Sequence, residues 1–142
     1  MRRQVCGLGA ALATLLAALP APAHHSVPGQ FDVRNTVELT GVIRDVEWIN
    51  PHVYIALDVE DAGGSVVTWN LATLPTAMLR KAGLTKEMLM GDGRPVTVRA
   101  LTARDQTRHL GWTIIITYAD GHHYQLSEDY SRASAATEGA RP

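Results

Sequence analysis

The chain has 142 residues, with 13 basic and 14 acidic side chains and a formal net charge of −1 at pH 7. No block of like charge stands out. A nucleic-acid-binding protein would need a basic stripe to neutralise phosphates, so we expect no nucleic-acid partner. A chain of this length can bury an ordinary hydrophobic core as one domain.

Residues 1–23 have the pattern of a secretory signal peptide. Two arginines precede an uncharged run over 5–19, which is shorter than the roughly 20 residues of a membrane-spanning helix. The small residues of 21–23 suit a signal peptidase. The sequence therefore predicts cleavage before His24, a periplasmic or secreted location, and no membrane span after cleavage. An uncleaved membrane anchor is the alternative.

From Thr36 onward the sequence alternates between apolar and polar residues, which is typical of half-buried strands. The alternation slips at Gly41, which predicts a bulge or a sharp coil in one long first strand. Residues 61–64 (DAGG) form a turn signal between a second and a third strand. On the second strand, the residues expected to share one face are Val53, Ile55, Leu57 and Val59.

The period then changes to that of a short helix over 75–82, with Pro75 in its first turn and Gly83 just after its end. Residues 85–89 are able to add one more turn. Three further strands follow, near 96–101, 111–118 and 122–126. On the middle one of these, the residues expected to share one face are Trp112, Ile114, Ile116 and Tyr118.

The element order is therefore β-β-β-α-β-β-β, in a mainly β, small single domain with one short helix. This order predicts an OB-like β-barrel, named after the oligonucleotide/oligosaccharide-binding fold. A flat antiparallel sheet with one helix packed on it is the alternative. We place an extended N-terminal arm at 24–35, the barrel at 36–126 and a flexible, polar C-terminal tail at 127–142.

The predicted mature chain starts with His-His-Ser, and the sequence also contains a Trp-Ile-Asn-Pro-His segment. These two motifs resemble those of a family of small exported bacterial proteins of unknown function. The resemblance implies an exported β-rich domain and no established activity. The residues that carry it are His24, His25, Ser26, Trp48, Ile49, Asn50, Pro51 and His52.

The histidines suggest a transition-metal site, with copper as the candidate. A free amine on His24 would chelate Cu(II) together with its imidazole, because nitrogen sites favour copper among the divalent metals. His25 is adjacent, and His52 follows a proline-stiffened turn from which it would supply a third ligand. Asn50 is a candidate to orient His52 by a hydrogen bond. The alternative is that His52 only satisfies a backbone carbonyl at its turn, with Trp48 covering it.

The hypothesis that we favour is a non-enzymatic module that binds an unknown protein or small ligand. Such a barrel would present a groove to a peptide, a glycan or a partner subunit. Tyr54 is the candidate residue of the ligand surface. Trp69 and Trp112 are further aromatic candidates, although core packing is the more common role of a tryptophan on a strand.

An enzyme is a third hypothesis with little support. The sequence contains neither a G-x-S-x-G nucleophile motif nor an H-E-x-x-H metal motif. A carboxylate pair on the first two strands would be able to perform acid–base chemistry, although charges on the solvent face of a hairpin are more common. The four carboxylates concerned are Asp45, Glu47, Asp58 and Glu60.

Overall fold

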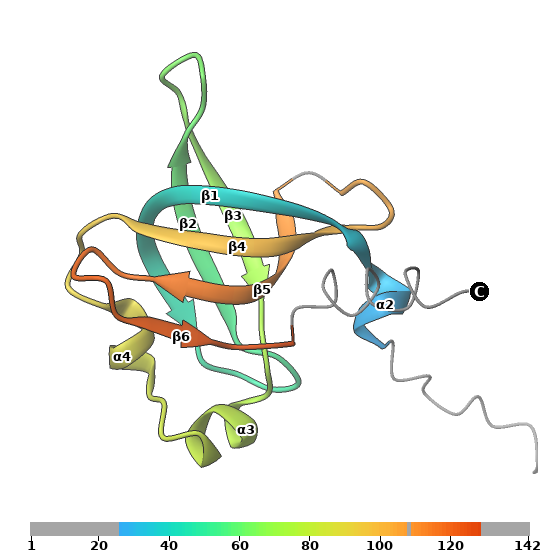
Figure 1. Ribbon diagram of the computed structural model, residues 1–142, viewed down its shortest axis with the longest axis vertical. Helices are drawn as coiled ribbons and strands as arrows, with labels where there is room; N and C mark the ends of the chain where they lie inside the picture. The colour runs from blue at the N-terminus through green and yellow to red at the C-terminus, as the bar shows by residue number, and fades with distance from the viewer. Residues whose placement is uncertain (1–25, 108, 129–142) are drawn as a thin grey trace, which may run out of the picture.

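The alternating residues form six strands, accompanied by three short helices, in the computed structural model, which describes residues 26–107 and 109–128 (Figure 1). In chain order the elements are α2 (Val27–Gln30), β1 (Phe31–Glu47), β2 (Tyr54–Glu60), β3 (Val66–Ala72), α3 (Thr76–Lys81), α4 (Lys86–Met90), β4 (Val96–Ala103), β5 (Leu110–Thr117) and β6 (His123–Gln125). The predicted signal peptide, His24, His25 and the tail beyond Glu128 lie outside the described residues.

The six strands form one sheet in the order β3-β2-β1-β4-β5-β6, with antiparallel neighbours. A parallel pairing of Asn70–Ala72 in β3 with Leu110–Trp112 in β5 closes this sheet on itself. The predicted OB-like barrel is thereby confirmed, since a flat sheet would leave these two strands apart. Among the described residues, no helix is long and apolar enough to cross a membrane.

β1 is long because it serves both halves of the barrel. Its residues from Phe31 to Gly41 pair with β4, and those from Val42 to Glu47 pair with β2. The predicted slip proves to be two separate features. A bulge lies between Ile43 and Asp45, whereas Gly41 is the place where β1 changes its partner strand.

The structure begins β1 at Phe31, before the expected start at Thr36, and a single helical turn, α2, precedes it. Phe31 is buried and pairs with Ala103 of β4. The pairing with β4 is irregular between Asp32 and Thr36. This irregularity breaks the period of two, and it explains why the alternation in the sequence becomes visible only from Thr36.

The expectation of one short helix is corrected to three among the described residues. α3 forms within the predicted range, and α4 follows it as a separate element. Thr85 caps the start of α4, since its side-chain oxygen accepts a hydrogen bond from the backbone N–H of Met88 at 3.3 Å. Figure 1 shows α3 and α4 together at one end of the barrel, where Leu79 and Leu89 are fully buried.

The apolar side chains form two clusters on opposite faces of the sheet. The larger cluster fills the barrel and includes Ile55, Leu57, Ala100 and Ile116. In the smaller cluster, Leu101 follows directly after Ala100 and therefore points to the other face. The buried members of this smaller cluster are Phe31, Ala72, Leu101, Trp112 and Ile114.

Candidate functional site

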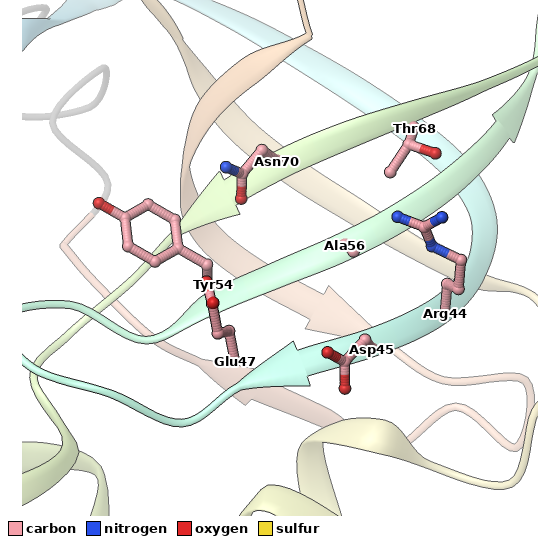
Figure 2. Close-up of a pocket in the computed structure, with 7 residues that line it drawn as sticks. All are labelled: Arg44, Asp45, Glu47, Tyr54, Ala56, Thr68 and Asn70. Carbon is pink, nitrogen blue, oxygen red and sulfur yellow. The ribbon is translucent and has the colours of Figure 1, made fainter.

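A groove of about 410 Å³ crosses β1, β2 and β3 on the outer surface of the barrel (Figure 2). All three strands contribute side chains to it, and most of these side chains are polar. This size falls within the range of about 300–1,000 Å³ that is typical of small-molecule sites. The lining residues are Arg44, Asp45, Glu47, Tyr54, Ala56, Thr68 and Asn70.

The register of the three strands explains why the surface is hollow here. Asp45 pairs with Ala56, and Ala56 pairs with Asn70, so these three residues form one row across the sheet. The middle residue of the row has only a methyl group. In the next row Glu47 pairs with Tyr54. The floor of the groove is therefore Ala56, and the phenol of Tyr54 stands at one end (Figure 2).

The bulge in β1 adds a charge at the other end of the groove. Because the register shifts between Ile43 and Asp45, both Arg44 and Asp45 are exposed instead of alternating between the faces. Arg44 Nε lies 3.8 Å from Asp58 Oδ1. The hydroxyl of Thr68 donates to the same oxygen at 2.6 Å. Asp58 thus connects the guanidinium of Arg44 to Thr68 of β3, beside the groove.

Asp45 carries a negative charge at neutral pH. Lys86 Nζ of α4 donates a hydrogen bond to Asp45 Oδ1 at 3.3 Å. This bond, with a smaller contribution from the backbone N–H of Val46, lowers the pKa of the Asp45 carboxyl below its usual value. The acidic and basic residues that line the groove are then one arginine, Arg44, and two carboxylates, Asp45 and Glu47.

The structure places Tyr54, the predicted ligand-surface residue, in the groove and half-buried. The other two aromatic candidates lie elsewhere. Trp112 is only 3% exposed and belongs to the smaller apolar cluster, so packing is its role. Trp69 faces away from the groove, because it alternates with the groove residues Thr68 and Asn70 on β3.

His52 lies in the loop between β1 and β2 and does not line the groove. Its Nδ1 is 3.1 Å from the carbonyl oxygen of Thr73, and its ring meets that of Trp112 edge-on, with 5.3 Å between centroids. Trp48, expected to cover His52, instead lies under the guanidinium of Arg80 at 5.9 Å. A bond to a backbone carbonyl was anticipated at the turn of this histidine, but the carbonyl belongs to Thr73, which follows β3.

Asn50 connects the loop between β1 and β2 to α3. Asn50 does not serve as the orienting partner of His52, because its Oδ1 accepts a hydrogen bond from the hydroxyl of Thr76 in α3 at 3.0 Å. The peptide bond between Asn50 and Pro51 is cis. Ser26 is exposed at the start of α2, where its carbonyl oxygen accepts from the N–H of Gly29 at 2.8 Å.

No metal centre is formed by the described residues alone. Within 26–107 and 109–128 there is no group of three His, Cys, Asp or Glu side chains with the spacing of a metal site. Two of the three predicted copper ligands, His24 and His25, lie outside these residues. The copper hypothesis therefore stays a prediction.

Four groove residues were not among the sequence candidates: Arg44, Ala56, Thr68 and Asn70. One signal in the sequence pointed to three of them. The turn at 61–64 fixes the pairing of β2 with β3, and this pairing sets Ala56 opposite Asn70 and Asp58 opposite Thr68. Arg44 had no such signal, because its position depends on the bulge in β1.

The fold and the groove together define a small β-barrel protein with a polar groove on its outer surface. The chain belongs to the Family of unknown function (DUF6152), whose model matches residues 12–111. No match was found among curated proteins or among solved structures. The resemblance inferred from the sequence is thus confirmed as membership of a family of unknown function.

Proposed function

We propose that this protein is an exported, non-enzymatic binding module that holds a polar ligand or a segment of a partner in the groove of β1, β2 and β3. The observation that carries the proposal is the hollow above Ala56, bounded by Tyr54 at one end and by Arg44 at the other. Export is supported by the signal-peptide pattern of residues 1–23. In barrels of this topology, the face of the second and third strands is a common place for ligands.

The charges of the groove favour a neutral or cationic ligand. Two carboxylates against one guanidinium do not provide the positive field that phosphates require, which supports the absence of a nucleic-acid partner. The same charges argue against acid–base catalysis here. Asp45 is paired with Lys86 and has a lowered pKa, whereas a general acid needs a pKa near the working pH.

The proposed binding role of the groove is tested with a variant whose larger side chain fills it. The protein is exported with its own leader, purified from the periplasm under mild conditions, and examined by native mass spectrometry for a bound species. We expect Ala56→Leu to lower the occupancy about tenfold, because the larger side chain takes up the hollow. Tyr54→Ala should have a similar effect, because the phenol supplies the largest contact surface.

The matched control is Val66→Leu, which enlarges an exposed residue at the far end of β3 without touching the groove. It should keep the full occupancy. If the wild-type protein carries no bound species, or if Ala56→Leu and Val66→Leu carry the same amount, the groove is not the binding site.

A copper-binding function is a second candidate, and the hydrogen bond of His52 is compatible with it. A carbonyl oxygen can only accept, so Nδ1 is the donor in the bond to Thr73, and Nε2 is the ring nitrogen that this bond leaves for a metal. Histidine ligands of metals commonly make this kind of bond with the ring nitrogen that does not bind the metal. The remaining proposed ligands are His24 and His25 at the predicted mature terminus.

The copper function predicts that His52→Ala weakens Cu(II) binding by about tenfold or more, because a chelate loses one of its three ligands. Binding is measured by titration calorimetry on the mature chain, and circular dichroism checks that the variant is folded. His123→Ala removes an exposed histidine of β6 and serves as the control. Equal affinity of the wild type and His52→Ala would leave only a loose chelate at the terminus.

A further inference from the structure

A second cavity, of about 340 Å³, lies on the other side of β3 from the groove. Trp69 is its aromatic wall, and the loop between β4 and β5 covers one side. Figure 1 shows this loop on the side of the barrel away from α3 and α4. Trp69 is half-buried against the core of the barrel, so that part of its indole remains accessible from the cavity. The groove and this cavity are separate sites, because Thr68 and Asn70 of β3 face the groove, whereas Trp69 between them faces the cavity.

The lining of the cavity combines one large aromatic ring with neutral hydrogen-bonding groups. Among the described residues that line it, none is an Asp, Glu, Lys or Arg. Two are amides, Asn35 and Gln106, and the structure gives neither side chain a hydrogen-bond partner among the described residues. The ring of His109 meets that of Trp69 edge-on, with 5.4 Å between centroids.

Two charged residues of the loop that covers the cavity, Arg104 and Asp105, do not line the cavity and instead make hydrogen bonds that hold the loop. The guanidinium of Arg104 donates two hydrogen bonds to the carbonyl oxygen of Pro28, at 3.0 and 3.2 Å. The backbone N–H of Arg104 donates to the carbonyl oxygen of Gln30 at 2.9 Å. Asp105 Oδ1 accepts from the N–H of Thr107 at 3.0 Å. A wall fixed in this way loses little freedom when a ligand binds.

The backbone of this loop is also unusual. Gln106 and His109 have φ angles of 61° and 57°, and they are the only non-glycine residues with positive φ in the described part of the chain. Such backbone conformations cost free energy and concentrate at ligand-binding sites. The carbonyl oxygen of His109 accepts from the N–H of Asn70 at 2.7 Å, which ties this end of the loop to β3.

We infer that this cavity binds a neutral, hydroxyl-rich ligand, namely a saccharide. A pyranose ring has an apolar C–H face that packs on an indole, and hydroxyl groups that both donate and accept hydrogen bonds. Trp69 supplies the flat surface. The amides of Asn35 and Gln106 supply paired donors and acceptors without charge. This inference is independent of the proposed groove.

The test titrates the folded, mature protein with maltotetraose and, separately, with cellotetraose, while NMR follows the indole N–H signals. The chain has three tryptophans, and the variant Trp69→Phe assigns the signal of Trp69. With at least one tetrasaccharide we expect the Trp69 signal to shift saturably, with a Kd of about 1 mM or below. The signals of Trp48 and Trp112 should stay in place, because neither residue lines the cavity.

The variant Gln106→Gly separates binding from folding. Glycine adopts the positive φ of this position without strain, so the variant should be at least as stable as the wild type. Because it lacks the amide, its Kd should rise about fivefold. Asn35→Ala should act in the same direction. Gln125→Ala, which removes an exposed amide from β6, should leave the Kd unchanged.

Three results would overturn the inference. One is a Trp69 signal that moves with neither tetrasaccharide. Another is a shift of all three indole signals together, which would indicate a general effect on the protein. The last is a Kd that stays within about twofold in both Gln106→Gly and Asn35→Ala, since those amides would then have no role.

Discussion

At the scale of single residues, two small residues, Gly41 of β1 and Ala56 of β2, have opposite tasks. Ala56 leaves space outside the barrel, and this space is the groove. Gly41 leaves space between strands, because the carbonyl of Asp58 comes so close that any Cβ at this position would overlap it. The approach occurs where β1 leaves β4 and begins to pair with β2. A glycine is needed at such a corner.

We therefore expect Gly41→Ala to lower the free energy of unfolding by about 3 kcal/mol or more, because backbone atoms must move to admit the methyl group. Urea denaturation measures the change. Gly63→Ala is the matched control, since a Cβ there meets only the side chain of Asp61 at 3.3 Å; its effect should stay within about 1 kcal/mol. Equal stability of the two variants would contradict the role given to Gly41.

At the scale of elements, the sequence predicts strands well where the pairing is regular. In β2 and just before it, the residues expected to share one face do so: Val53, Ile55 and Leu57 are fully buried, and Val59 is half-buried. The pairing of β2 with β3 is unbroken from Tyr54 to Glu60. A period of two in the sequence then translates directly into two faces.

The prediction for β5 is wrong for a physical reason. Trp112, Ile114, Ile116 and Tyr118 were expected on one face, but the first two belong to the smaller apolar cluster and the last two to the core of the barrel. The pairing with β4 shifts between Arg99 and Ala100, and one extra residue moves the following side chains to the other face. Such a bulge leaves no mark in the alternation of the sequence.

The same limit applies to the candidate site. Tyr54 was found from the sequence because it alternates with buried residues on a regular strand. Arg44 was missed because only the bulge turns it toward the groove, and bulges depend on contacts between strands. His52 was found as a residue, but its partner Thr73 is distant in sequence and was not predicted. The local sequence pattern thus predicts which single side chains belong to a site better than it predicts the residues that contact them in the fold.

At the scale of the whole molecule, the helices, the groove and the second cavity lie on different parts of the barrel. Two helices occupy one end, the groove lies on the outer face of three strands, and the second cavity lies behind β3. Arg44, Asp45 and Glu47 line the groove, whereas the described lining of the second cavity contains no Asp, Glu, Lys or Arg. Five exposed carboxyl groups have a pKa below the usual value, namely Asp45, Glu87, Asp92, Asp105 and Asp120.

These carboxyl groups predict the response of the protein to acid. Each of these carboxyl groups has a lower pKa in the folded state than in the unfolded chain, where the pKa is about 4. Their contribution to stability is therefore complete above that pH and is lost as the pH falls through the folded-state values. For Asp92 the largest cause is the hydrogen bond from Arg94, whose Nε lies 2.7 Å from Asp92 Oδ2.

We expect the Tm, followed by circular dichroism, to be nearly constant from about pH 7 to pH 5 and to fall steadily between about pH 4 and pH 2. Asp92→Asn should have a lower Tm at pH 7, because an amide pairs less strongly with Arg94, and a smaller loss of Tm in acid. The two Tm curves should approach each other at about pH 2, where Asp92 is protonated in the wild type. Parallel curves down to that pH would show that Asp92 does not contribute through its charge.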